Sequence, residues 1–262
     1  MDRTDLSAFQ ADFDTLRTRL PSDAVASLAR EVLTRVAQQS RDAVNEPTEL
    51  EKLTQALISA DDTALNALVE HYHNSDMPVE VLYLRHLAPA ARLLGEWWEN
   101  DKATLSDVAV GTGRIYALMR AFNHRLPPSP RLVGKQAFFA SVPGETHTLG
   151  VSMAVDLYRR EGWKIEIAMG VPHDVLVDRI VSSGHMLIGL SAGGVHALPD
   201  LARLILALRV SIPHARILVS GNIVAEAEDS IRLIHPDAMN SSYEGAHEEL
   251  ETLWKQLGAT TA

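Results

Sequence analysis

The chain has 262 residues, 46% of them hydrophobic, which is enough for one large domain or two modest ones with real cores. It has 34 acidic and 24 basic residues, a formal net charge of -10, and no cluster of Lys and Arg that could follow a phosphate backbone, so we expect no direct nucleic-acid binding. The absence of cysteine excludes disulfides, thiolate-held metals, iron–sulfur clusters and cysteine nucleophiles.

Membrane insertion is also not expected. No apolar stretch approaches the roughly 20 residues that cross a bilayer, and the polar, acidic first residues do not resemble a secretory signal. We therefore expect a cytoplasmic protein. Because the chain has no cysteine, we expect any metal to be held by histidine or carboxylate, or to arrive inside a cofactor.

The first half of the chain has the apolar spacing of helices. Residues 1–46 are predicted to be an N-terminal helical extension with an amphipathic helix from Ala24 to Ala37 and Ser22 as its N-cap. Four more helices are predicted at Glu49–Ala60, Asp62–His73, Pro78–Asn100 and Ser106–Asn123. Since short connections make antiparallel neighbours, residues 47–124 are predicted to form a four-helix bundle.

A linker at 125–134 divides the chain, because the three prolines within 127–130 forbid a continuous helix. Residues 135–262 then alternate strand-like and helical patterns. The predicted strands are Gln136–Val142, Lys164–Met169, Met186–Leu190, Arg216–Val219 and a weak one at Ala238–Met239; the predicted helices are 148–161, 174–183, 196–209 and 245–257. This alternation predicts a parallel, doubly wound sheet of the flavodoxin-like (Rossmann-like) α/β class.

Three small polar segments lie where predicted strands end: Gly144–Gly150, Ser191–Gly193 and Ser220-Gly221. The 40 residues 151–190 separate the first two segments, and the 26 residues 194–219 separate the last two. Because the carboxyl ends of the strands line the ligand crevice of an open α/β sheet, the segments predict a binding site for a large cofactor around one histidine.

That histidine is His147, and Glu145 lies two residues before it. A carboxylate bonded to one imidazole nitrogen fixes the tautomer and makes the other nitrogen a better metal ligand. Gly150 removes a side chain where a wide ligand would approach the backbone. The alternative is a histidine that only caps the next helix or hydrogen-bonds within the loop.

The pattern Glu145-x-His147-x-x-Gly150, followed at a distance by Ser191 and then Gly221, resembles the motif of the cobalamin-binding domains: Asp-x-His-x-x-Gly, Ser-x-Leu and Gly-Gly. The resemblance implies a cobalamin cofactor, with its hydroxo, methyl or adenosyl form left open, and His147 as the lower cobalt ligand. It also implies that the loops around the cofactor and its nucleotide tail contain Glu145, Thr146, Thr148, Gly150, Ser191, Gly193, Gly194, Ser220, Gly221 and Asn222.

The chain departs from this motif at three positions. Glu145 replaces Asp, Gly193 stands where Leu is usual, and Ser220 stands where the first Gly of the pair is usual. The last two departures leave the depth and shape of the tail pocket open. Ser191 and Gly193-Gly194 could instead be ordinary strand-to-helix turn residues.

The segment Leu94–Glu99 resembles the cap helix that covers the upper corrin face in cobalamin proteins of the methionine synthase and light-responsive regulator type. The alignment places Trp98 over the corrin, with Trp97 as a core aromatic. In those light-responsive regulators Glu-His follows ten and eleven residues later, whereas this chain has Val108-Ala109. The upper face is therefore open to exogenous ligands, or served by His86 or His124.

The whole-chain layout is similar to the AerR/PpaA regulators of purple photosynthetic bacteria. That similarity implies a cobalamin-dependent, light-responsive antirepressor, not an enzyme, that acts on a partner repressor of photosystem genes of the CrtJ/PpsR type. The chain has no P-loop and no dinucleotide, hydrolase-elbow or zinc-protease motif. Two alternatives remain open: a corrinoid carrier of a methyltransferase system, and a haem-binding sensor of the same fold.

Overall fold

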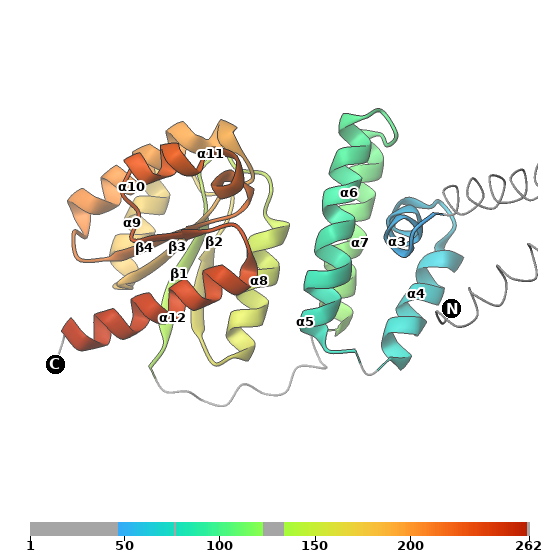
Figure 1. Cartoon of the computed structure of the whole chain (residues 1–262), viewed down its shortest axis with the longest axis horizontal. Coiled ribbons are helices and arrows are strands. Elements are labelled where there is room, and N and C mark those ends of the chain that lie inside the picture. The colour runs from blue at the N-terminus through green and yellow to red at the C-terminus, as the bar shows by residue number, and fades with distance from the viewer. Residues whose placement is uncertain (1–46, 76, 123–133, 261–262) are drawn as a thin grey trace, which may run out of the picture. The chain divides into compact units, whose positions relative to one another are not determined.

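The computed structural model describes residues 47–75, 77–122 and 134–260 (Figure 1). The predicted helix Ala24–Ala37, most of the predicted linker and His124 lie outside the described residues. The residues from Leu50 onward belong to one compact unit. None of the described helices combines the length and the apolarity that a membrane crossing requires.

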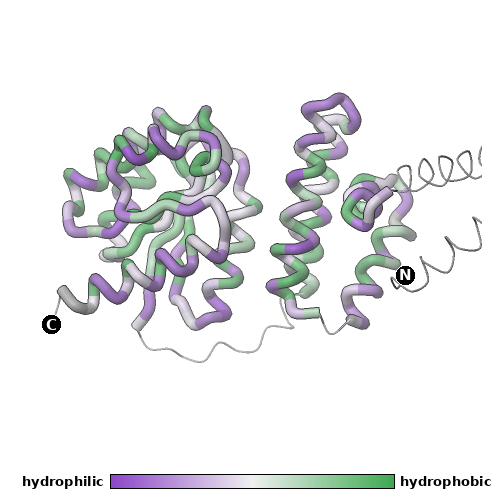
Figure 2. The backbone as a smooth tube through the Cα atoms, in the orientation of Figure 1, coloured by the Kyte–Doolittle hydropathy of each residue, from purple (hydrophilic) through white to green (hydrophobic). Residues whose placement is uncertain are grey.

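The helical half contains all four predicted helices, and each begins within one residue of its predicted first residue. They are α3 (Glu49–Ile58), α4 (Asp62–Asn74), the continuous run α5 (Val79–Val81), η1 (Leu82–Leu87) and α6 (Ala88–Glu99), and α7 (Leu105–Phe122). Their apolar sides bury a shared core that includes Leu57, Tyr83, Leu87, Ile115 and Phe122. The turn between α6 and α7 is hydrophilic (Figure 2).

The third predicted helix is not uniform, because η1 is a π-helix in the middle of it. The backbone N–H of Ala88 donates to the carbonyl of Tyr83, five residues earlier, in place of the usual four. Pro89 follows directly; it has no N–H for the carbonyl of Arg85, and its ring would crowd that carbonyl in a regular α-helix. The wider winding therefore accommodates this proline.

The second half is a five-stranded sheet in the order β2-β1-β3-β4-β5, with every strand pair parallel. Its strands are β1 (Gln136–Ser141), β2 (Lys164–Ala168), β3 (Leu187–Ser191), β4 (Arg216–Ser220) and β5 (Ala238–Asn240). The predicted flavodoxin-like sheet is thus confirmed. The strand order reverses between β1 and β3, where the chain leaves the two strands toward opposite faces and opens a crevice.

Helices cover both faces of the sheet (Figure 1). One face packs against α8 (Leu149–Arg160) and α12 (Tyr243–Thr260), the other against α9 (His173–Ser183), α10 (Leu198–Ser211) and α11 (Asn222–Leu233). The sequence patterns missed α11. Its buried stripe is short (Ile223, Val224 and Ile231), and non-helical dihedrals at Ala227 interrupt it, so the helical period is weak.

Helix α8 joins the helical half to the sheet. Met153 and Leu157 on its outer side belong to the same buried cluster as Tyr83. The Tyr83 hydroxyl donates to Asp156 Oδ2 over 3.4 Å, and the Arg160 guanidinium lies 5.7 Å from the centre of the Tyr83 ring. This helix starts at Leu149, two residues after His147, so it connects the candidate site to η1.

We expect Asp237→Asn to destabilise the sheet by about 2–3 kcal/mol, because charge-assisted hydrogen bonds would be lost. The Asp237 carboxylate precedes β5 and accepts from Arg209, from Arg216 and from the backbone N–H of Ile217. Burial alone would raise the pKa of Asp237, but these donors outweigh it and hold the pKa below the ordinary 3.8.

The same carboxylate gives the prediction a pH dependence. Since the pKa is lower in the folded than in the unfolded chain, this stabilisation is present above pH 3.8 and is lost as the pH falls through the folded-state value. Urea unfolding at neutral and acidic pH measures it. The difference in free energy of unfolding between wild type and variant should become smaller as the pH is lowered. A difference that stays constant would contradict the role given to the Asp237 carboxylate.

Candidate functional site

The candidate site lies at the carboxyl edge of the sheet, at the reversal between β1 and β3. The loop after β1 contains Glu145 and His147, and the segment after β3 contains Gly193 and, in a short 3-10 helix, His196. Gly144, with φ of 83°, permits the tight turn that leads from β1 into the first loop. Both loops therefore open into the crevice that the strand order predicts.

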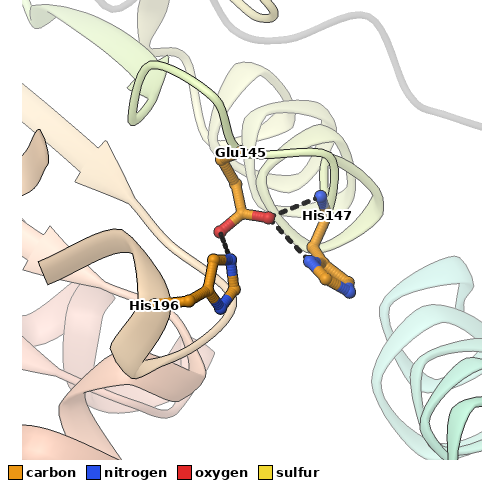
Figure 3. Close-up of side chains that lie close together, drawn as sticks. All are labelled: Glu145, His147 and His196. Atoms are coloured by element: carbon orange, nitrogen blue, oxygen red, sulfur yellow. Dashed lines mark hydrogen bonds and ion pairs between the residues drawn. The ribbon is translucent and has the colours of Figure 1, made fainter.

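Glu145 is the buried centre of the site, with its side chain fully shielded from solvent. One carboxylate oxygen, Oε1, accepts from the His147 backbone N–H at 2.8 Å and contacts His147 Nδ1 at 2.6 Å. The other, Oε2, accepts from the Gly193 backbone N–H at 2.6 Å. The predicted carboxylate–imidazole pair is therefore present (Figure 3). The Glu145 carboxylate also joins the first loop to the second through its hydrogen bond from Gly193.

The charge of this carboxylate is maintained by its donors. Burial alone would raise the pKa of Glu145, but the hydrogen bonds from Gly193 and His147 outweigh it and lower the pKa. The His147 side chain is 68% exposed, and its second ring nitrogen points away from the carboxylate (Figure 3). An ionised carboxylate thus holds Nδ1, while Nε2 remains available to a ligand.

Two residues that lie beside these loops were missed by sequence reasoning. His196 lies in η3 (Val195–Ala197), and its Nε2 is 3.6 Å from Glu145 Oε2. Glu226 on α11 accepts from the Val195 backbone N–H at 2.9 Å and from the Asn222 amide at 2.6 Å. The proximity of His196 to Gly193-Gly194 in the sequence could have indicated it, whereas Glu226 acts across 31 residues without any local signal.

Steric contacts explain why glycine occupies positions in the second and third segments. A Cβ on Gly193 would lie 2.8 Å from His147 Nδ1, so the glycine that replaces the usual leucine is what allows this imidazole position. Gly221 has φ of 101°, and a Cβ there would lie 2.3 Å from the Ala192 carbonyl oxygen. Gly150 has open space around its Cβ position, so no protein contact requires a glycine there.

A row of four small polar residues crosses the sheet next to these loops. Ser141 pairs in register with Ser191, Ser191 with Ser220, and Ser220 with Asn240. Because side chains alternate along a strand, the row shares the face of Phe139, Leu187 and Leu218, which is the face covered by α8 and α12. The sequence indicated Ser191 and Ser220; the register adds the other two.

The remaining predicted residues have the following positions. Thr146 is exposed, and Thr148 is the N-cap of α8, with its Oγ1 3.0 Å from the Tyr116 hydroxyl of α7. Asn222 begins α11 and contacts Glu226 as described above. Their direct contact with a cofactor stays a prediction.

The residues assigned to the upper corrin face lie on the helical half. Trp98 is on the last turn of α6 and is 49% exposed, whereas Trp97 is half-buried. His86 Nδ1 lies 3.1 Å from the Tyr72 hydroxyl, and burial, with His71 nearby, lowers the pKa of His86. The placement of Trp98 over a corrin stays a prediction, as does His86 as an upper ligand.

Comparisons with known proteins point to one cofactor class. Residues 49–122, which span α3 to α7, match the family model described as a B12 binding domain. The chain is 21% identical over 170 residues to an uncharacterised 20.5 kDa protein in the bchF-crtJ intergenic region of Rhodobacter capsulatus, covering 64% of this chain and 88% of that one.

A solved structure shares the fold of this chain. The monomethylamine corrinoid protein of Methanosarcina barkeri superposes with a TM-score of 0.65 at 16% identity, over 78% of this chain and 97% of that one. A cobalamin-binding protein from Desulfitobacterium hafniense DCB-2 is 17% identical over 79% of this chain and 98% of that one, with a TM-score of 0.41. The superposition with the monomethylamine corrinoid protein shows a shared fold, and the match to the B12 binding domain supports cobalamin as the cofactor.

Proposed function

We propose that this chain is a cobalamin-binding, light-responsive regulator that acts through a partner repressor of photosystem genes. The observation that supports cobalamin binding most directly is the Glu145–His147 pair at the β1–β3 reversal, with Nδ1 engaged and Nε2 exposed.

Each part of the site has a role in this proposal. His147 Nε2 would hold the cobalt, and Glu145 would orient the ring and increase its basicity. The row of Ser141, Ser191, Ser220 and Asn240 offers hydroxyl and amide groups to the polar nucleotide tail. Bound cobalamin would supply a cobalt centre whose upper ligand can be exchanged or released by light.

Helix α8 is the element through which occupancy of the site reaches the helical half. Its first residue follows the His147–Thr148 pair, and Thr148 contacts Tyr116 on α7. Its last turns contact Tyr83 of η1 through Asp156 and Arg160. A shift of His147 would therefore act on both ends of the helical core, in the manner of a two-state element biased by its ligand.

The regulatory part of the proposal rests on different support. The relative from Rhodobacter capsulatus is named for its place between bchF and crtJ, a photosynthesis-gene context. The acidic balance of this chain, 34 acidic against 24 basic residues, suits contact with a basic DNA-binding partner better than with DNA itself. The partner we propose is a repressor of the CrtJ/PpsR type.

A second candidate function is corrinoid carriage in a methyltransferase system. The observation that favours it is the fold shared with the monomethylamine corrinoid protein over nearly all of that chain. Residues 1–46, which precede the matched helices, favour the regulator instead. A haem-binding sensor remains the third possibility, and the cofactor spectrum separates it from the other two.

The test is to purify the protein with hydroxocobalamin and with adenosylcobalamin and record absorption spectra in the dark and after illumination. Each form is then added to the repressor on operator DNA in a mobility-shift assay. We expect a light-dependent spectrum and release of the repressor by one state only. If the protein took part in methyl transfer with a partner enzyme and had no effect on the repressor, its function would be that of a corrinoid carrier and not of a regulator. A haem absorption spectrum would exclude both functions.

A further inference from the structure

We propose that Glu145, His147 and His196 form a binding site for a divalent transition metal ion, Zn²⁺ above all, in the cobalamin-free protein. One donor atom from each residue lies within 4.8 Å of the other two. Two imidazoles and one carboxylate are ligands that Zn²⁺ accepts, with a fourth position left to water.

The carboxylate of this triad is preorganised. Backbone N–H groups from both loops hold its two oxygens: His147 donates to Oε1 and Gly193 to Oε2. A fixed anion between two imidazoles is the feature that distinguishes this triad from exposed histidines elsewhere on a surface.

The imidazoles come from separate loops and converge on this anion (Figure 3). Their ring centres are 6.1 Å apart. Each faces a glycine: a Cβ on Gly193 would lie 2.8 Å from His147 Nδ1, and one on Gly194 would lie 3.2 Å from His196 Nδ1. Consecutive glycines thus leave space for both rings, and the anchoring of Val195 by Glu226 fixes the backbone beside His196.

Both rings can adjust to an ion at small cost. The side chains of His147 and His196 are 68% and 59% exposed, so rotation toward a shared ion breaks no buried packing. The ion would replace the contact between Nδ1 and Oε1 and neutralise the buried anion. It would remain open to solvent on one side, which is the arrangement of an exchangeable site.

This site has a consequence that rests on the proposed function. If His147 Nε2 is also the lower cobalt ligand, an imidazole committed to Zn²⁺ is not positioned for cobalt, and the ion and the cofactor exclude one another. His196 has no part in cobalt ligation under that proposal. Its removal should therefore affect the two ligands differently.

The direct test is titration of untagged, full-length, cobalamin-free protein with Zn²⁺ by calorimetry, and with Co²⁺ followed by visible absorption. We expect one equivalent of either ion. His196→Ala and His196→Gln should each weaken binding at least about tenfold, while His214→Ala, at the amino edge of the sheet, should leave it unchanged. The proposal would be overturned if both His196 variants bound the ion as tightly as the wild type, or if the wild type and all variants bound it equally weakly.

A competition assay separates this proposal from the function above. Hydroxocobalamin binding is measured with and without saturating Zn²⁺. We expect Zn²⁺ to inhibit the wild type and the His196 variants to escape inhibition while still binding cobalamin. If the protein binds Zn²⁺ but no cobalamin, the cofactor assignment alone is rejected. If Zn²⁺ does not change cobalamin binding to the wild type, a Zn²⁺ site that includes His147 is rejected.

Discussion

His147→Ala should lower the affinity for hydroxocobalamin at least about 100-fold, since loss of even a residue that only supports a metal ligand costs about 10–100-fold. His147 is exposed, so the variant should fold normally. The loss should be visible as an absorption spectrum that no longer shows an imidazole on cobalt. Equilibrium dialysis gives the affinity, and the spectrum gives the cause.

Matched variants make this result specific. Glu145→Gln retains the size of the side chain and the ability to accept from Gly193, but removes the charge, and should cost about 10–100-fold. His214→Ala removes an exposed histidine at the opposite edge of the sheet and should cost nothing. Corrinoid bound by His147→Ala with an unchanged spectrum would show that another residue is the lower ligand.

Gly221→Ala should destabilise the folded protein by about 3 kcal/mol, the largest effect on stability that we expect from adding a single methyl group. Two causes combine. Gly221 has φ of 101°, a backbone conformation that alanine rarely adopts, and its Cβ would lie 2.3 Å from the Ala192 carbonyl oxygen. Because the backbone fixes the position of Cβ and the oxygen is itself a backbone atom, no side-chain rotation relieves the contact.

Gly150→Ala is the control for this prediction. It also adds one methyl group to a glycine of the site, but on helix α8 and in open space, so it should be neutral or stabilise by up to about 1 kcal/mol. Urea unfolding of the two variants against wild type measures the difference. Equal midpoints for Gly221→Ala and wild type would mean that the loop at Ala192 moves freely, contrary to the packing described.

The bounds of the strands could be predicted closely because each strand is a short apolar run that ends at a polar turn. β1, β2, β3 and β4 each lie within one residue of the predicted bounds, and the weak β5 is also present. His147 and Glu145 could be paired from the sequence because only one residue separates them. Their 2.6 Å contact follows from local geometry that the turn at Gly144 sets up.

The rest depends on contacts between distant parts of the chain. His196 approaches Glu145 only after β3 pairs with β1, and Glu226 reaches Val195 only after α11 packs on the sheet. The π-winding of η1 is a local response to Pro89 that a 3.6-residue period does not reveal. Helix α11 was missed because the kink at Ala227 interrupts its apolar period.

The polar row of Ser141, Ser191, Ser220 and Asn240 has a consequence for folding. The row exists only in one register, because a slip of one residue in any strand would send its polar member to the other face and bring an apolar neighbour such as Val219 into the row. A ligand that spans the row binds the correctly registered sheet alone. By mass action, free ligand at 100 times its Kd would stabilise that register by about 2.7 kcal/mol, so the cofactor would also select the native strand pairing during assembly.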